Sequence, residues 1–250
     1  MLKNYFNKAV FFFGALVIAS ACKTLYPVQE HATLLPATKN IAPDSSIKAY
    51  YHPYKDSLDK IMNATIVELT MDLYKKQPES TLGNLMVDIL KSKAQEYTKD
   101  KMDLAILNFG GIRMASVSKG MLRVEDAYLL MPFDNYVVAQ KLTGQQVADF
   151  CDSIARMKGW PVAGISFKIK DQKAIDIKIN NAPLDYTQTY NVALIDYVAN
   201  GGDGMAFLKH IPQVQTGKLF REAILEYWKE QAKAGRKISS TLENRISYAE

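Results

Sequence analysis

The sequence predicts a single domain of the α+β class, in which a mixed sheet is flanked by helices. Apolar and polar residues alternate over 165–169 and again over 175–179 across a polar turn, which is typical of an antiparallel hairpin. Segments with helical spacing lie on both sides of this hairpin, which argues against a purely parallel wound sheet. The composition, with 48% hydrophobic and 23% charged residues, is that of an ordinary globular chain.

The individual elements follow from the spacing of apolar residues. Helices are predicted over residues 54–62, 82–90, 147–154 and 220–228. Ser80 or Thr81 is placed to cap the second helix, and Thr143 opens the third. Short apolar runs predict further strands over residues 64–69, 104–107 and 190–195.

The N-terminal residues 1–22 are predicted to be a signal peptide. Two lysines precede an unbroken apolar run of thirteen residues from Ala9 to Ala21, which is shorter than the roughly 20 residues needed to cross a bilayer. The small residues before Cys22 resemble the processing site of bacterial lipoproteins, so Cys22 is expected to carry lipid. The alternative is a simple secreted protein. We therefore expect an exported lipoprotein, anchored to a membrane on its periplasmic or cell-surface face.

Residues 23–48 contain three prolines and no sustained period, which predicts a flexible tether. The folded domain is then expected to cover residues 49–250. Cys151 lies on the apolar stripe of a predicted helix, so a buried, inert thiol is expected there.

Charge and motif content exclude several classes of function. A formal charge of +5, from scattered basic residues, is too small to indicate binding of a nucleic-acid polymer. None of the three histidines has a second histidine or a carboxylate at a metal-ligand spacing, and no GxSxG is present. We expect no metal and no other cofactor in this chain.

Three glycine-bearing segments have the residues that a ligand site needs. They are residues 79–88, 108–113 and 196–204. Glycines just beyond a strand let a ligand approach the backbone, and the planar fork of Arg113 can hold a phosphate or a carboxylate. Each segment taken alone is more simply explained as a tight turn. The residues by themselves therefore indicate no more than a crevice for an anion or a flat ring.

Taken together, these segments resemble the C-terminal, substrate-binding domain of the 5′-nucleotidase family, in a standalone lipoprotein form. The matching runs are ESTLGNLMVDIL (79–90), NFGGIR (108–113), MPFDN (131–135) and YVANGGDG (197–204). They occur in the order of that family, and the resemblance covers about residues 50–250. Four motifs at matching spacings are a far stronger signal than any one of them.

The resemblance implies a site for a nucleotide or nucleoside. Phe133 and Tyr197 fall on the positions whose rings sandwich the base, with Tyr197 replacing the more usual phenylalanine. Asn135 is expected to hydrogen-bond the base edge and Asp203 the ribose hydroxyls.

The resemblance also implies which residues lie near the phosphate and which residue lines the slot for the base. Asn108 and Arg113 are expected toward the phosphate. Lys76 stands where the family often has arginine, so it keeps the charge but not the bidentate geometry. Gly164 is expected to line the base slot.

The N-terminal metallophosphatase domain of that family has no counterpart in this sequence. The resemblance therefore implies half of a split 5′-nucleotidase, with the two divalent metals and the hydrolytic chemistry on a separate chain. A non-catalytic nucleoside- or nucleotide-binding lipoprotein is the alternative, and a lipoprotein with a decayed pocket is a third reading.

Overall fold

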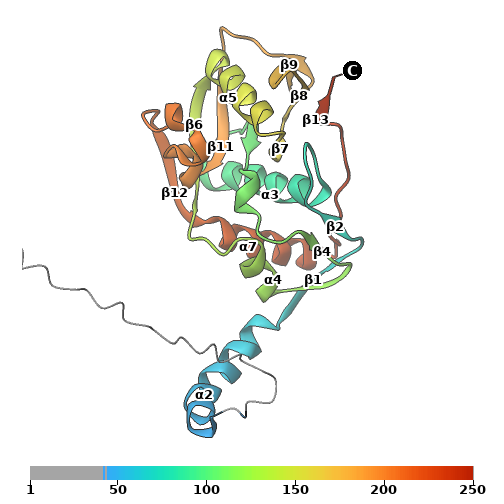
Figure 1. Cartoon of the computed structure of the whole chain (residues 1–250), viewed down its shortest axis with the longest axis vertical. Coiled ribbons are helices and arrows are strands. Elements are labelled where there is room, and N and C mark those ends of the chain that lie inside the picture. The colour runs from blue at the N-terminus through green and yellow to red at the C-terminus, as the bar shows by residue number, and fades with distance from the viewer. Residues whose placement is uncertain (1–41, 43, 250) are drawn as a thin grey trace, which may run out of the picture. The chain divides into compact units, whose positions relative to one another are not determined.

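The computed structural model describes residues 42 and 44–249, and its contacts divide the chain between Tyr50 and Tyr51 (Figure 1). The predicted signal peptide with Cys22, and residues 23–41 of the predicted tether, lie outside the described residues. Helix α2 (Ser45–Met62) begins inside the segment expected as tether, because the Asp44 carboxylate accepts from the backbone N–H groups of Ser46 (2.8 Å) and Ile47 (3.2 Å) and caps it. The last four residues of the segment predicted as tether, 45–48, thus belong to a helix.

The main sheet has five strands, in the order β12-β6-β11-β3-β7. They are β12 (Gln213–Leu219), β6 (Tyr136–Thr143), β11 (Thr189–Ile195), β3 (Leu104–Ile106) and β7 (Val162–Ala163). β11 and β3 run parallel, whereas the other neighbours are antiparallel. The sheet is therefore mixed, which confirms the predicted α+β class.

A second sheet contains the predicted hairpin, in the order β10-β9-β8-β13. Its strands are β8 (Ile165–Lys170), β9 (Lys173–Ile179), β10 (Ala182–Pro183) and β13 (Ile246–Tyr248). Two further pairs are small: β1 (Thr65–Leu69) with β5 (Gly120–Arg123), and β2 (Leu73–Tyr74) with β4 (Ser116–Val117).

Two helices begin at side-chain caps where the sequence places them. The Ser80 hydroxyl accepts from the Gly83 N–H and opens α3 (Thr81–Thr98), and Thr143 with Gln146 forms a capping box for α5 (Gly144–Arg156). The remaining helical segments are α4 (Val124–Leu130), α6 (Asp196–Ala199), α7 (Phe220–Lys233), η1 (Phe109–Gly111), η2 (Gly202–Gly204) and η3 (Ala206–Leu208). None of the described helices combines the length and the apolarity that a membrane-spanning helix needs.

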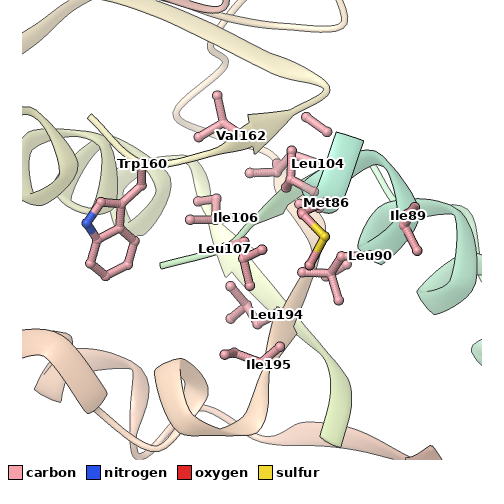
Figure 2. Packing of buried hydrophobic residues seen from close by; sticks show 14 of the residues in the cluster. Met86, Ile89, Leu90, Leu104, Ile106, Leu107, Trp160, Val162, Leu194 and Ile195 are labelled. Atoms are coloured by element: carbon pink, nitrogen blue, oxygen red, sulfur yellow. The ribbon is translucent and has the colours of Figure 1, made fainter. Parts of the chain in front are cut away.

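The core forms where α3 packs across the main sheet. Met86 and Leu90 on α3 contact the apolar layer that includes Leu104 on β3 and Leu194 on β11 (Figure 2). Cys151 on α5 is fully buried and unbonded to sulfur, as predicted, and burial raises the pKa of its thiol. This core fixes the main sheet, and with it the loops that leave the sheet.

The first glycine-bearing segment fastens the C-terminal end of the chain. Both oxygens of Glu79 accept backbone N–H groups there, from Glu243 at 2.8 Å and from Arg245 at 3.1 Å. Arg245 is a buried residue, and its guanidinium donates to both Asp88 oxygens at 2.8 and 2.9 Å and to the Val162 carbonyl at 2.9 Å. Residues 79–88 thus hold β13 and the preceding loop in place through charge-assisted hydrogen bonds.

Replacing Arg245 with lysine is expected to lower the free energy of unfolding by about 1–3 kcal/mol, because lysine cannot reproduce the bidentate contact with Asp88. Urea denaturation followed by circular dichroism measures this difference. Arg156→Lys, at an exposed arginine on α5, is the matched control and should change stability by less than about 0.5 kcal/mol. Equal stability of Arg245→Lys and the native chain would show that the guanidinium contact contributes nothing.

Candidate functional site

Sheet pairing brings three loops to one edge of the main sheet. β11 and β3 are parallel, with Val192 opposite Leu104, so their C-terminal ends lie together. β6 is antiparallel to β11, with Val137 opposite Ile195, so the start of β6 lies at the same edge. The loops after β3, before β6 and after β11 therefore meet, although they are far apart in sequence.

These loops enclose a cavity of about 270 Å³. It is lined by Asn108, Gly110, Gly111, Arg113, Phe133, Asn135, Tyr197 and Asp203. Six of the eight residues that the sequence assigns to substrate binding are among them. The volume is slightly below the roughly 300–1,000 Å³ of typical pockets for small ligands.

The other two residues assigned to the site, Lys76 and Gly164, do not line this cavity. Gly164 has φ +74°, and a Cβ there would lie 2.2 Å from the Asp103 carbonyl oxygen, so close backbone packing requires glycine at this turn. The Lys76 ammonium lies 5.7 Å from the centre of the Tyr74 ring. The preceding lysine, Lys75, instead contacts the loop of the cavity.

The Asp203 carboxylate is held by two donors inside the site. The Tyr197 hydroxyl donates to Oδ1 at 2.9 Å, and Asn108 Nδ2 donates to Oδ2 at 2.7 Å. The hydrogen bond to Asp203 raises the pKa of Tyr197. Asn108 is 4% exposed, and its Oδ1 is buried without a protein hydrogen-bond partner among the described residues.

Two aromatic side chains of the cavity wall are exposed. Phe133 is 40% and Tyr197 is 45% exposed. The Tyr197 ring lies against Gly202, where a Cβ would be 2.5 Å from Tyr197 Cε1. Only glycine at position 202 lets the ring take this place.

Side chains outside the cavity fix the loops that carry these rings, and sequence reasoning did not identify them. Arg221 on α7 donates to the carbonyl of Phe133 at 3.3 Å and to Asp134 Oδ1 at 2.7 Å. Asp196 Oδ1 accepts the N–H groups of Tyr136 (3.0 Å) and Tyr197 (2.8 Å). No local pattern marks this role, because the partners Phe133, Asp134 and Tyr136 lie about 60 to 90 residues away in the sequence.

One end of the cavity carries positive charge. Arg113 approaches the Phe133 ring at 5.7 Å and the Gly110 carbonyl at 3.4 Å. Nearby, Lys75 donates to the Ile112 carbonyl at 2.6 Å, and burial together with the Arg113 charge lowers the pKa of Lys75. In the described part of the chain neither cation has a carboxylate within 4.0 Å. An anion at this end would be favoured.

The described residues contain no group of three or more His, Cys, Asp or Glu side chains placed to hold a metal ion. The cavity instead combines two aromatic faces, an amide at Asn135, a fixed carboxylate and a guanidinium. Such a set can hold a flat heterocycle, hydroxyl groups and an anion along one path.

Comparison with known proteins agrees with this arrangement. The family model "5′-nucleotidase, C-terminal domain" matches residues 60–210. Protein UshA of Escherichia coli is 34% identical over 155 residues, covering 60% of this chain and 27% of that protein. The 5′-nucleotidase of Vibrio parahaemolyticus is 27% identical over 202 residues, covering 75% of this chain and 34% of that protein. This chain thus matches about a third or less of the length of either relative.

Solved structures show the same fold. The 5′-nucleotidase precursor of Thermus thermophilus superposes with a TM-score of 0.68 at 27% identity, over 82% of this chain and 42% of that chain. The family model covers more than half of the sequence, and its match includes the strands and loops that form most of the cavity. The chain belongs to the 5′-nucleotidase C-terminal domain family.

Proposed function

We propose that this protein is the nucleotide-recognising half of a split 5′-nucleotidase, which acts with a separate metallophosphatase chain on phosphoric monoesters of nucleosides. The observation that carries the proposal is the convergence of Phe133, Tyr197, Asp203 and Arg113 on one cavity. The name 5′-nucleotidase carried by relatives such as that of Vibrio parahaemolyticus supports it.

The base binds between the rings of Phe133 and Tyr197, both of which line the cavity and remain exposed. Stacking of a base on an aromatic side chain contributes about 1–3 kcal/mol and tolerates different bases, since every base has a π face. Asn135 offers an amide to the base edge, where it can donate and accept.

The ribose and the phosphate contact the lining residues that the base leaves free. Asp203 accepts from the ribose hydroxyls, and Arg113 takes the phosphate, because its charge has no carboxylate partner within the described residues. Lys75 adds a second positive charge close to Arg113. Lys76 is a neighbour in sequence but does not line the cavity.

The chemistry of ester hydrolysis is assigned to the partner chain, whose two divalent metals supply a bound hydroxide and neutralise the phosphate. The cavity described above does not fit such a metal pair. Among the described residues that line it, Asp203 carries the one carboxylate, and each oxygen of that group already accepts a hydrogen bond, from Tyr197 or from Asn108. This chain therefore binds and orients the nucleotide.

Anchoring of this protein to a membrane would favour its association with a separate partner chain. We assign a lipid anchor to Cys22, on the strength of the apolar run that precedes it. If the partner is held at the same membrane, the effective concentration of the two chains rises, so a weak non-covalent contact between them is sufficient.

Phe133→Ala is expected to weaken binding of both AMP and adenosine by about 1–3 kcal/mol, since it removes one stacking surface. Isothermal titration calorimetry on the isolated chain measures both affinities. Arg113→Gln is the matched control: it should weaken AMP binding and leave adenosine binding unchanged, because only AMP carries the phosphate. Unchanged affinities in Phe133→Ala would refute the proposed base site.

Co-expression with exported metallophosphatases from the same genome tests the split enzyme. We expect AMP hydrolysis that requires both chains and falls about 10-fold or more with Phe133→Ala. The released phosphate is measured with and without a chelator. Tight nucleoside binding that no metallophosphatase converts into hydrolysis would instead identify a non-catalytic nucleotide-binding lipoprotein.

Cys22→Ala is expected to release the protein from membranes into the soluble fraction, because burial of acyl chains contributes about 0.8 kcal/mol per CH₂ and the variant has no site for them. Membrane and soluble fractions are compared by immunoblotting, with Cys151→Ala as the control that should stay membrane-bound. Membrane association of Cys22→Ala equal to that of the native protein would contradict lipidation at this residue.

A further inference from the structure

The hydroxyl of Tyr197 does more than complete an aromatic ring, because it contacts the carboxylate of the cavity. Tyr197 Oη lies 2.9 Å from Asp203 Oδ1, while Asn108 Nδ2 lies 2.7 Å from Asp203 Oδ2. We propose that Tyr197 is a positioning residue that holds the Asp203 carboxylate for a vicinal diol, so that the protein selects ribonucleosides over deoxyribonucleosides. This inference rests on the proposed function.

Asp203 needs such support because its own backbone constrains it little. It has a left-handed φ of 51° within η2, and Gly202 and Gly204 flank it, the latter with φ +81°. Glycines on both sides allow many backbone conformations, and a free aspartate side chain would populate several rotamers. Two hydrogen bonds from opposite sides restrict the carboxylate to one orientation.

The two donors leave the carboxylate able to accept a ligand. An ionised carboxylate has about four lone-pair positions, and one on each oxygen is used by Tyr197 and by Asn108. About two positions remain, which matches the two O–H donors of a vicinal diol. A 2′- or 3′-deoxy sugar brings only one of those donors, so it makes one hydrogen bond fewer to the carboxylate.

The amide of Asn108 holds the Asp203 carboxylate in a defined orientation. Asn108 Oδ1 is buried, lacks a hydrogen-bond partner among the described residues and belongs to a side chain that lines the cavity. Its orientation is fixed, because exchanging the amide oxygen and nitrogen would place two acceptors together at Asp203. Asn108 therefore presents Nδ2 to Asp203, and the carboxylate remains the acceptor that the hydroxyl groups of a ligand can complement.

The Tyr197→Phe substitution removes the hydroxyl and keeps the aromatic ring. The ring lies against Gly202 through its carbon atoms, a contact that the substitution keeps. The hydrogen bond to Asp203 raises the Tyr197 pKa, so the phenol remains a donor throughout the neutral range. Because Tyr197 is 45% exposed, the bond contributes little to folding, and its loss should change ligand choice more than thermal stability.

Calorimetric titration of the isolated chain with adenosine, 2′-deoxyadenosine and 3′-deoxyadenosine tests the inference. The native chain should bind adenosine more tightly than either deoxy compound. Tyr197→Phe should lower this preference by about 3- to 10-fold, the size of one hydrogen bond, and leave the affinity for the deoxy compounds within about twofold. Asp203→Asn should abolish the preference. Tyr186→Phe, at an exposed tyrosine that does not line the cavity, should change neither.

The outcomes separate this inference from the function on which it rests. An unchanged preference in Tyr197→Phe overturns the role of the hydroxyl and leaves the nucleoside site standing. Equal weakening of all three compounds also overturns it, since the hydroxyl would then act on the base, and so does tighter adenosine binding by Tyr197→Phe. No binding of any compound by the native chain overturns both the inference and the proposed function.

Discussion

The site depends on the register of three neighbouring strands. β3 and β11 run parallel, and β6 pairs antiparallel with β11, with Val137 opposite Ile195. This register alone determines that Asn108, at the end of β3, reaches Asp203, which lies 95 residues later in the chain. A shift of one residue would turn alternate side chains to the other face of the sheet, so the core under α3 also maintains the cavity.

The loops are fixed mainly by polar contacts, which keeps their aromatic rings available. Arg221 binds the carbonyl of Phe133, and Asp196 accepts N–H groups at the start of β6 and α6. Because these bonds hold the backbone, the rings of Phe133 and Tyr197 do not have to be buried to be positioned. A site preorganised in this way loses less entropy when a ligand binds.

The segments that resemble the family have different roles in the structure. Residues 108–113 and 197–204 supply the cavity, whereas Glu79 and Asp88 hold the C-terminal segment through Arg245 and the backbone. Segments of both roles contain glycines next to polar residues. A ligand and a neighbouring backbone each need a position without a Cβ when they approach the chain closely. A motif in the sequence therefore does not show whether its residues bind a ligand or stabilise the fold.

The sequence by itself determined the local elements and the family. Ser80 and Thr143 cap the predicted helices, and the hairpin of β8 and β9 follows from alternation, because these signals act over a few residues. Strands β6 and β12, helix α4 and the roles of Asp196 and Arg221 were missed. Lys76 and Gly164 were assigned to a cavity that they do not line. Those features depend on which distant segments pair in the sheet. Only the tertiary structure decides that pairing, because its energy comes from contacts between two segments and cannot be assigned to the sequence of either one.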